Sequence, residues 1–327
     1  MSRVYFDPDP TDLRPHEGAG EPATLDEYRN RHAQYRSDED LQACHAAFPW
    51  LVVLDDHEIA NGWADDIPHD PKVLTTAAFR AKRAAALRAY YEHMPLRRSS
   101  LPRGVDIQLY RRATLGDLLD VHLLDTRQYR SDQNQQRRLD PSRTILGDQQ
   151  ERWLLTNLAG PTARWNALAQ QVFFSQLDLD SGPAQRFNND SWDNYVAERD
   201  ALRDHIAAVG VPNPVILTGD VHATYVCDVK ADFADPRSAT VATELVGTSI
   251  SSFGDGADTV PGDQSQLAEN PHIRFINRRR GYLRHIVTPE TWITDIRVVD
   301  HVTKPASPIT TRASFAIEHH HPGAVPT

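Results

Sequence analysis

Residues 51–58 read LVVLDDHE, residues 121–127 read VHLLDTR and residues 215–222 read VILTGDVH. In each stretch a short apolar run ends at an aspartate or within two residues of one. Short apolar runs rich in β-branched residues are typical of strands that are buried on both faces of a sheet. Ligands of open α/β sheets bind just beyond the carboxyl ends of such strands. The three stretches therefore predict an α/β fold with one convergent site, which we interpret as a metal site that acts on an anion.

The chain between and around these stretches alternates helices with strands and then becomes richer in strands. Thr24 and Glu27 have the spacing of a capping box at the start of a helix. Apolar periodicity predicts helices near residues 24–35, 38–47, 75–94, 148–158 and 193–209. It predicts strands near residues 50–54, 105–112, 117–124, 167–175, 214–218, 239–246, 282–287 and 292–299. Residues 1–23 are expected to form an irregular loop segment.

Composition narrows the class of protein. The chain has 327 residues, 40% of them hydrophobic and 24% charged, with a net charge of −10. An acidic chain is a poor nucleic-acid scaffold, but it can still bind a small phosphorylated substrate through local arginines or metal ions. Two cysteines, Cys44 and Cys227, make neither a disulfide framework nor a thiolate cluster. The sequence contains no stretch typical of a transmembrane segment and no signal-peptide pattern at its start.

The first motif is Asp55-Asp56-His57-Glu58. Carboxylates are hard oxygen ligands for metal ions, and an adjacent histidine can bind metal or donate a hydrogen bond to a phosphate oxygen. Four ionisable residues after a buried strand favour a functional site over the alternative, a solvated loop with a capping aspartate. Asn61 follows closely and could add a carbonyl ligand, although a loop-stabilising role is equally compatible with the sequence.

The second motif is Gly219-Asp220-Val221-His222. On an extended segment, residues two apart point to the same side, so Asp220 and His222 could face one metal ion or a pair of them. The alternative is a turn aspartate followed by a core histidine.

The third motif places Asp125 and Arg127 after the run 121–124. Arginine is suited to bidentate contact with phosphate, so Arg127 is a candidate for substrate binding. A structural ion pair between the two residues is an equal alternative. Glu244, Thr248 and Ser249 are weaker candidates for contacts around the site, and Arg278-Arg279-Arg280 is expected to be a solvated loop or in part a substrate-facing arginine.

Together these motifs resemble those of the PhoD-like metallophosphatases, the alkaline phosphatase D family within the calcineurin-like superfamily. The resemblance is carried, in order along the chain, by residues 24–29, 55–58, 124–130, 146–150, 190–195, 219–222, 244–249 and 280–282. It implies a sandwich of two mixed β-sheets flanked by helices. It also implies hydrolysis of phosphomonoesters and phosphodiesters at a polynuclear centre of ferric iron (Fe3+) and calcium (Ca2+).

The resemblance also implies roles for single residues. Asp56 and Asp220 correspond to metal ligands, His222 to an iron ligand, and His57 to a residue beside the phosphate. Tyr5 fits an iron-binding tyrosine, whereas Ser2 stands where the family has a bridging aspartate. A phosphate contact by Arg127 is our inference from the residue type.

The start of the chain departs from the family pattern. The family has an earlier strand ending in Gly-Asp-Tyr-Ile-Tyr-Glu, which aligns with residues 1–6. We therefore expect residues 1–327 to be a single PhoD-like domain that lacks its N-terminal part, including the first strand and a cysteine ligand. Loss of a bridging carboxylate should impair activity. Family members are typically exported to the periplasm or the extracellular space, but we expect no signal peptide at the start of residues 1–327.

The sequence thus predicts metal-dependent hydrolysis of a small phosphate ester. A phospholipase-like or nucleotide phosphodiesterase activity at the same centre is one alternative. A non-catalytic remnant that binds a phosphorylated ligand is another. The sequence leaves the substrate and the oligomeric state open.

Overall fold

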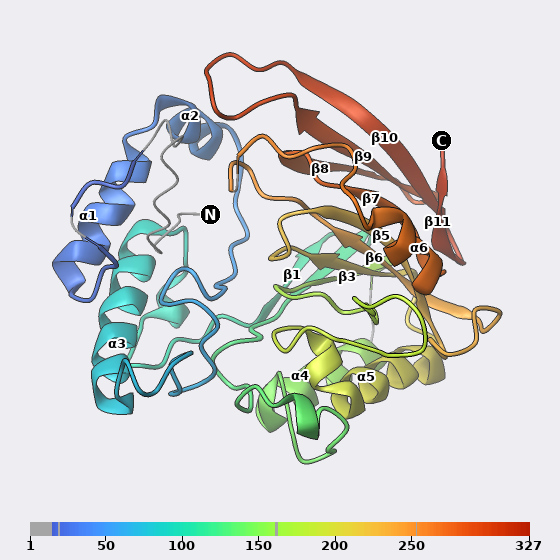
Figure 1. The fold of residues 1–327 in the computed structure, drawn as a ribbon, viewed down its shortest axis with the longest axis horizontal. Coiled ribbons are helices and arrows are strands. Elements are labelled where there is room, and N and C mark those ends of the chain that lie inside the picture. Colours follow the sequence, from blue (N-terminus) through green and yellow to red (C-terminus); the bar gives the residue numbers. More distant parts are fainter. Residues whose placement is uncertain (1–14, 19, 161–162, 253) are drawn as a thin grey trace. The chain divides into compact units, whose positions relative to one another are not determined.

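The computed structural model describes residues 15–18, 20–160, 163–252 and 254–327. The chain divides into two compact units (Figure 1). The first unit takes the chain up to Tyr110 together with Asp125–Asp132, and the second takes Arg111–Leu124 and Gln133–Thr327. The single domain predicted from the sequence stays a prediction.

The first unit is built on helices. They are α1 (Leu25–Arg36), α2 (Glu39–Ala47), α3 (Thr76–His93) and the short 3-10 helix η1 (Arg98–Ser100). The capping box predicted for α1 is confirmed: Thr24 Oγ1 accepts a hydrogen bond from Glu27 N, and the Glu27 carboxylate accepts one from Thr24 N at 2.9 Å. These contacts satisfy amide groups that a helix start otherwise leaves without partners.

The apolar core of the first unit holds the loop that carries the first motif. Tyr28 of α1 donates a hydrogen bond from its hydroxyl to the Ile59 carbonyl at 2.7 Å, and Tyr90 of α3 donates one to the Val53 carbonyl at 3.0 Å. Leu54 is buried in the same cluster. The strand predicted over 50–54 is wrong, because residues 51–55 belong to no strand that the structure describes. The run is apolar because it packs against the two helices.

Within the described residues, the second unit contains a seven-stranded mixed sheet, here called the first sheet. Its strands are β1 (Arg111–Leu115), β2 (Leu119–Leu123), β3 (Trp165–Ala169), β4 (Pro214–Thr218), β5 (Thr224–Lys230), β6 (Thr240–Val246) and β7 (Ile273–Asn277). Their order is β1-β2-β3-β4-β6-β5-β7, with β2, β3, β4 and β6 parallel. The carboxyl end of β4 leads directly into the second motif.

Helices and a second sheet flank the first sheet (Figure 1). The helices α4 (Gly147–Ala159) and α5 (Val196–Val209) bury leucine and isoleucine side chains against β3 and β4. The second sheet is antiparallel, with the order β11-β10-β9-β8. Its strands are β8 (Gly281–Val287), β9 (Thr291–Val299), β10 (Ile309–Glu318) and β11 (His321–Pro326).

Aromatic contacts join the two sheets of the second unit. The rings of Trp165 and Trp292 lie 5.8 Å apart between centroids, and those of Phe275 and Phe315 lie 5.5 Å apart. The predicted α/β fold with two sheets and flanking helices is therefore confirmed, with the correction that the second sheet is antiparallel. Short elements complete the chain: η2 (Gln135–Arg137), η3 (Trp192–Asn194) and α6 (Asp263–Glu269).

Several predicted element bounds need correction. The strand predicted over 105–112 begins later and spans Arg111–Leu115. The strand predicted over 167–175 ends earlier and spans Trp165–Ala169. The helix predicted from 193 begins at Val196, after a 3-10 turn. Strand β5 was missed because Asp228 and Lys230 interrupt its apolar pattern. Both are buried, and Asp228 accepts a hydrogen bond from Arg274 Nε at 2.8 Å.

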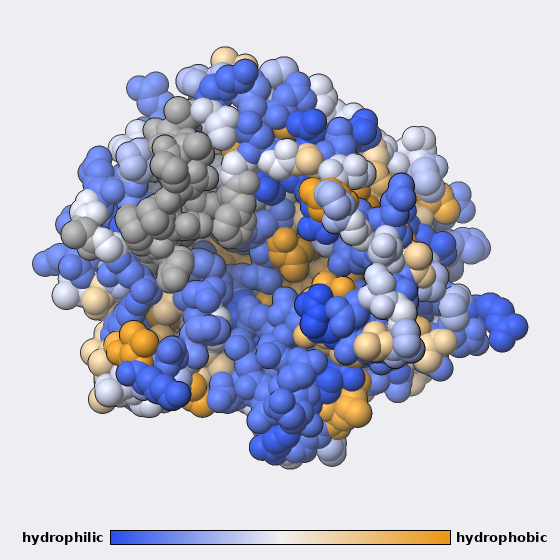
Figure 2. Space-filling view, in the orientation of Figure 1, coloured by the Kyte–Doolittle hydropathy of each residue, from blue (hydrophilic) through white to orange (hydrophobic). Residues whose placement is uncertain are grey.

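The visible surface is mostly hydrophilic, with small scattered apolar patches (Figure 2). Among the described residues, none of the helices combines the length and the apolar character that crossing a membrane requires.

Candidate functional site

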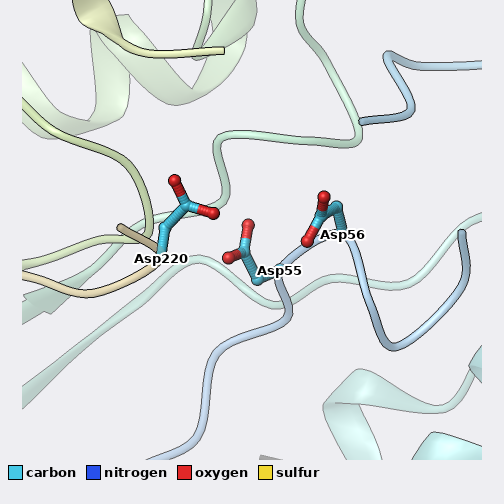
Figure 3. Close-up of side chains that lie close together, drawn as sticks. All are labelled: Asp55, Asp56 and Asp220. Atoms are coloured by element: carbon cyan, nitrogen blue, oxygen red, sulfur yellow. The ribbon is translucent and has the colours of Figure 1, made fainter. Parts of the chain in front are cut away.

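The predicted site residues fall in both units. Asp56, His57, Asn61 and Arg127 belong to the first unit, whereas Asp220 and His222 belong to the second. Figure 3 draws three of the carboxylates: Asp55 and Asp56 on the loop after residue 54, and Asp220 on the loop after β4. The predicted ligand Tyr5, like Ser2, lies outside the described residues.

Asp55 and Asp56 form a buried pair of neighbouring carboxylates. One oxygen of each lies within 4.8 Å of the other, and the two residues are only 6% and 3% exposed. Asp56 Oδ2 accepts a hydrogen bond from Gly62 N at 2.8 Å. Asp56 Oδ1 is buried and has no hydrogen-bond partner among the described residues. Because a buried carboxylate oxygen without a partner is costly, this atom fits a role as a ligand to a cation.

His57 and Glu58 complete the first motif in different ways. The His57 side chain is 36% exposed, and its Nε2 lies 3.8 Å from Asp56 Oδ1. Glu58 is buried and accepts a hydrogen bond from Asp55 N at 2.8 Å. Burial, and then the nearby Asp55 carboxylate, raise the pKa of Glu58 to about 7. The alternative of a solvated loop is wrong, because three of the four residues are buried.

Arg127 forms a buried ion pair with Asp55. Its Nε donates to Asp55 Oδ1 at 2.7 Å, its Nη2 lies 4.0 Å from Asp56 Oδ2, and its side chain has no exposed surface. Asp125 accepts hydrogen bonds from the backbone N–H groups of Arg127 and Gln128, at 3.0 and 2.9 Å. The arginine therefore fixes the loop of the first motif, 72 residues earlier in the chain.

The second motif has an unusual backbone. Asp220 and His222 have φ angles of 66° and 54°, in the left-handed region that non-glycine residues rarely adopt. Each such residue costs about 1–3 kcal/mol, and such residues cluster at functional sites. The extended segment expected from the sequence is wrong, because an extended strand has negative φ. Asn61 is half-buried in the loop of the first motif.

Glu244 anchors the strand that leads into this backbone. It lies on β6, has no exposed surface and accepts hydrogen bonds from Phe174 N, Ser175 N and Thr218 Oγ1, at 2.8, 2.8 and 2.7 Å. Burial raises the pKa of Glu244. Thr248, just after β6, has a buried hydroxyl oxygen without a hydrogen-bond partner among the described residues.

The run Arg278-Arg279-Arg280 is not a solvated loop. Arg278 pairs with Asp263 at 2.7 Å, and Arg279 lies 3.3 Å from Asp258. Arg280 is 5% exposed and donates to the His222 carbonyl at 2.8 Å. This contact was not predicted, since nothing in a run of three arginines distinguishes the third.

Comparison with known proteins places these residues in a family. A family model described as PhoD-like phosphatase matches residues 3–296. Alkaline phosphatase D of Bacillus subtilis (strain 168) is 48% identical over 314 residues, which are 94% of this chain and 53% of that protein. A solved structure described as "Structure of PhoD" matches 99% of this chain and 63% of that chain, with a TM-score of 0.94 and 45% identity. The chain thus spans about half the length of the curated relative that it matches.

Proposed function

The chain belongs to the PhoD-like phosphatase family, and we propose that it is a phosphoric ester hydrolase that requires bound metal ions. The observation that carries the proposal is the buried pair Asp55 and Asp56, in which Asp56 Oδ1 has no hydrogen-bond partner among the described residues. The family membership supports the reaction class, and this buried oxygen is a candidate ligand atom for a cation.

We propose that Asp56, Asn61, Asp220 and His222 form the ligand set. Support comes from the family match, which spans both units, and from the agreement with the solved structure over 99% of the chain. The carboxylate and amide oxygens suit a hard cation such as calcium, and the imidazole suits iron. Tyr5 as a further iron ligand stays a prediction.

Metal ions bound there would lower the pKa of a water molecule and neutralise charge on the phosphoryl oxygens. The residues of the chain supply the rest. His57 is the least buried member of the first motif, and we propose that its imidazole donates a hydrogen bond to a phosphate oxygen. Arg127 holds Asp55 in place. A direct phosphate contact by Arg127 also stays a prediction. Its guanidinium already pairs with the Asp55 carboxylate, so a phosphate would have to share it.

The experiment is a metal-reconstitution assay on the purified chain. A chelator removes bound metal, iron and calcium are returned, and hydrolysis of p-nitrophenyl phosphate and bis-p-nitrophenyl phosphate is followed. We expect hydrolysis only after reconstitution, and a preference between the two substrates would separate monoesterase from diesterase activity. Hydrolysis that survives complete metal removal would contradict the proposal.

Metal content separates the enzyme from a non-catalytic remnant. A remnant should bind iron below stoichiometry and show no turnover, whereas the proposed enzyme should bind the ions in full and hydrolyse substrate. The reduced turnover expected from Ser2 stays a prediction, which the absolute rate in the same assay measures.

A further inference from the structure

Arg280 is a buried arginine that holds the backbone of a predicted metal ligand. Its Nη1 donates to the His222 carbonyl at 2.8 Å, and its Nε donates to the Gly254 carbonyl at 2.9 Å. The guanidinium thus joins the second motif to the loop that follows β6. Hydrogen bonds from a charged donor are stronger than neutral ones, so these contacts are suited to hold a carbonyl in a fixed place.

The backbone of Arg280 is itself fixed from two sides. Its carbonyl accepts a hydrogen bond from Val299 N at 2.9 Å, and the next residue, Gly281, donates from its N–H to the Ser249 carbonyl at 3.1 Å. Gly281 also packs so tightly that a Cβ atom there would collide with the Arg297 carbonyl. The start of β8 therefore gives Arg280 a rigid base in the second sheet.

The backbone of His222 is in a strained conformation that a hydrogen bond to its carbonyl can stabilise. This backbone, like that of Asp220, is in the left-handed region, which costs a non-glycine residue free energy. Rotation to a negative φ would remove that cost. Relaxation at residue 222 would turn its carbonyl away and reorient its imidazole. The Arg280 hydrogen bond opposes that rotation, because it binds the carbonyl in the strained conformation.

We propose that Arg280 is a positioning residue, which keeps the His222 imidazole oriented for metal binding without touching the metal or the substrate. This inference rests on the proposed function, since it requires that His222 is a ligand. The neighbouring Arg279 provides a natural contrast. It lies in the same run, but it pairs with Asp258 and donates to the Asp300 carbonyl at 3.0 Å.

The test compares Arg280→Ala with Arg280→Lys and with the matched control Arg279→Ala. Iron and calcium content per chain is measured by mass spectrometry after equilibrium dialysis at several concentrations of each ion. Loss of a residue that orients a metal ligand typically lowers metal affinity about 10–100-fold. We expect a loss of iron affinity in that range for Arg280→Ala, a smaller loss for Arg280→Lys and none for Arg279→Ala.

Chemical rescue distinguishes positioning from general support of the fold. Millimolar guanidinium, too dilute to denature, can occupy the space left in Arg280→Ala and donate to the same carbonyl. We expect it to restore iron binding in Arg280→Ala and to leave Arg279→Ala unchanged. Wild-type iron affinity in Arg280→Ala, or a folding defect that guanidinium leaves uncorrected, would overturn the inference.

The same samples separate this inference from the proposed function. A wild-type chain that hydrolyses phosphate esters with bound metal, together with an Arg280→Ala variant of unchanged iron affinity, refutes the positioning role alone. A wild-type chain that binds neither ion refutes the proposed function and the positioning role with it.

Discussion

At the scale of single residues, Asp56 has two carboxylate oxygens in different environments. Oδ2 accepts a hydrogen bond from Gly62 N, whereas Oδ1 is buried and without a hydrogen-bond partner among the described residues. The first oxygen fixes the side chain, and the second is the atom that we propose as a ligand to a cation. Replacement by asparagine should preserve the first role and weaken the second, since an amide oxygen can accept the Gly62 hydrogen bond but carries no charge.

We therefore expect Asp56→Asn to fold normally and to lose metal binding. Its melting temperature without metal should stay near that of the wild type, and its affinity for calcium should fall at least about 10-fold because a charged ligand is lost. Isothermal titration with calcium measures the affinity. Asp40→Asn, which changes an exposed carboxylate of α2, is the control. Unchanged calcium affinity in Asp56→Asn would contradict the assignment.

The ion pair of Arg127 and Asp55 makes a second residue-scale prediction. Arg127→Met would leave Asp55 buried without its charge partner, which typically costs about 3–5 kcal/mol. Urea unfolding should show that loss, and the double variant Asp55→Asn with Arg127→Met should recover part of it because the buried charge is gone. A double variant that is less stable than Arg127→Met would show that the pair is not coupled in this way.

The sequence could predict which residue types gather here, but not their partners. Asp55, Asp56 and Arg127 stand out as ionisable residues after apolar runs. The ion pair between Asp55 and Arg127 joins positions 72 apart, and the left-handed backbone at His222 receives a hydrogen bond from Arg280. Neither feature has a local signal, because both arise from tertiary packing.

At the scale of elements, the N-cap residue of α4, Leu146, makes no side-chain hydrogen bond to the start of the helix. Thr144 Oγ1 accepts a hydrogen bond from the first helical amide, Gly147 N, at 2.7 Å, and Glu198 of α5 binds the segment just before the helix. Its carboxylate accepts hydrogen bonds from Thr144 Oγ1 at 2.9 Å, from Leu146 N at 3.3 Å and from Ile145 N. A residue of α5 thus fixes the segment that leads into α4, and the two helices pack through one apolar cluster.

Glu198 predicts a pH-dependent contribution to stability. Burial raises its pKa to about 7 from an ordinary value of 4.5. The folded state therefore binds the proton more tightly, so the contribution of Glu198 to stability falls as pH rises from 4.5 through about 7. Glu198→Gln removes this titration. We expect the variant to gain about 1–3 kcal/mol relative to the wild type between pH 5 and pH 8.

Urea unfolding of both proteins across this pH range measures the difference. Glu39→Gln, at an exposed position of α2, controls for a general effect of removing a carboxylate. A difference in unfolding free energy that stays constant with pH, or grows in the opposite direction, would contradict a raised pKa.

Elements with a strong local signal were predictable. The capping box of α1, the apolar face of α3 and the strand β4 all carry one, and the predicted range of β4 agrees with the structure. The segment 50–54 was mispredicted because an apolar run has the same pattern whether it pairs in a sheet or packs on helices. Strands such as β5 were missed where ion pairs allow charged residues to be buried.

At the scale of the whole molecule, the proposed ligands are divided between the two compact units. The first unit offers Asp56 and Asn61, and the second offers Asp220 and His222. Neither set would hold an ion tightly alone, since calcium takes six to eight oxygen ligands. Metal binding should therefore be lost when either set is substituted, and the family match over residues 3–296 is the reason to expect it.

Anomalous X-ray diffraction from crystals grown with iron and calcium tests the central claim most directly. We predict anomalous peaks within about 2.6 Å of Asp56 and Asp220 carboxylate oxygens, with an iron peak about 2.0–2.3 Å from a His222 ring nitrogen. Fully loaded crystals in which the carboxylate of Asp56 lies far from the side chains of Asp220 and His222, with no ion between them, would contradict the account.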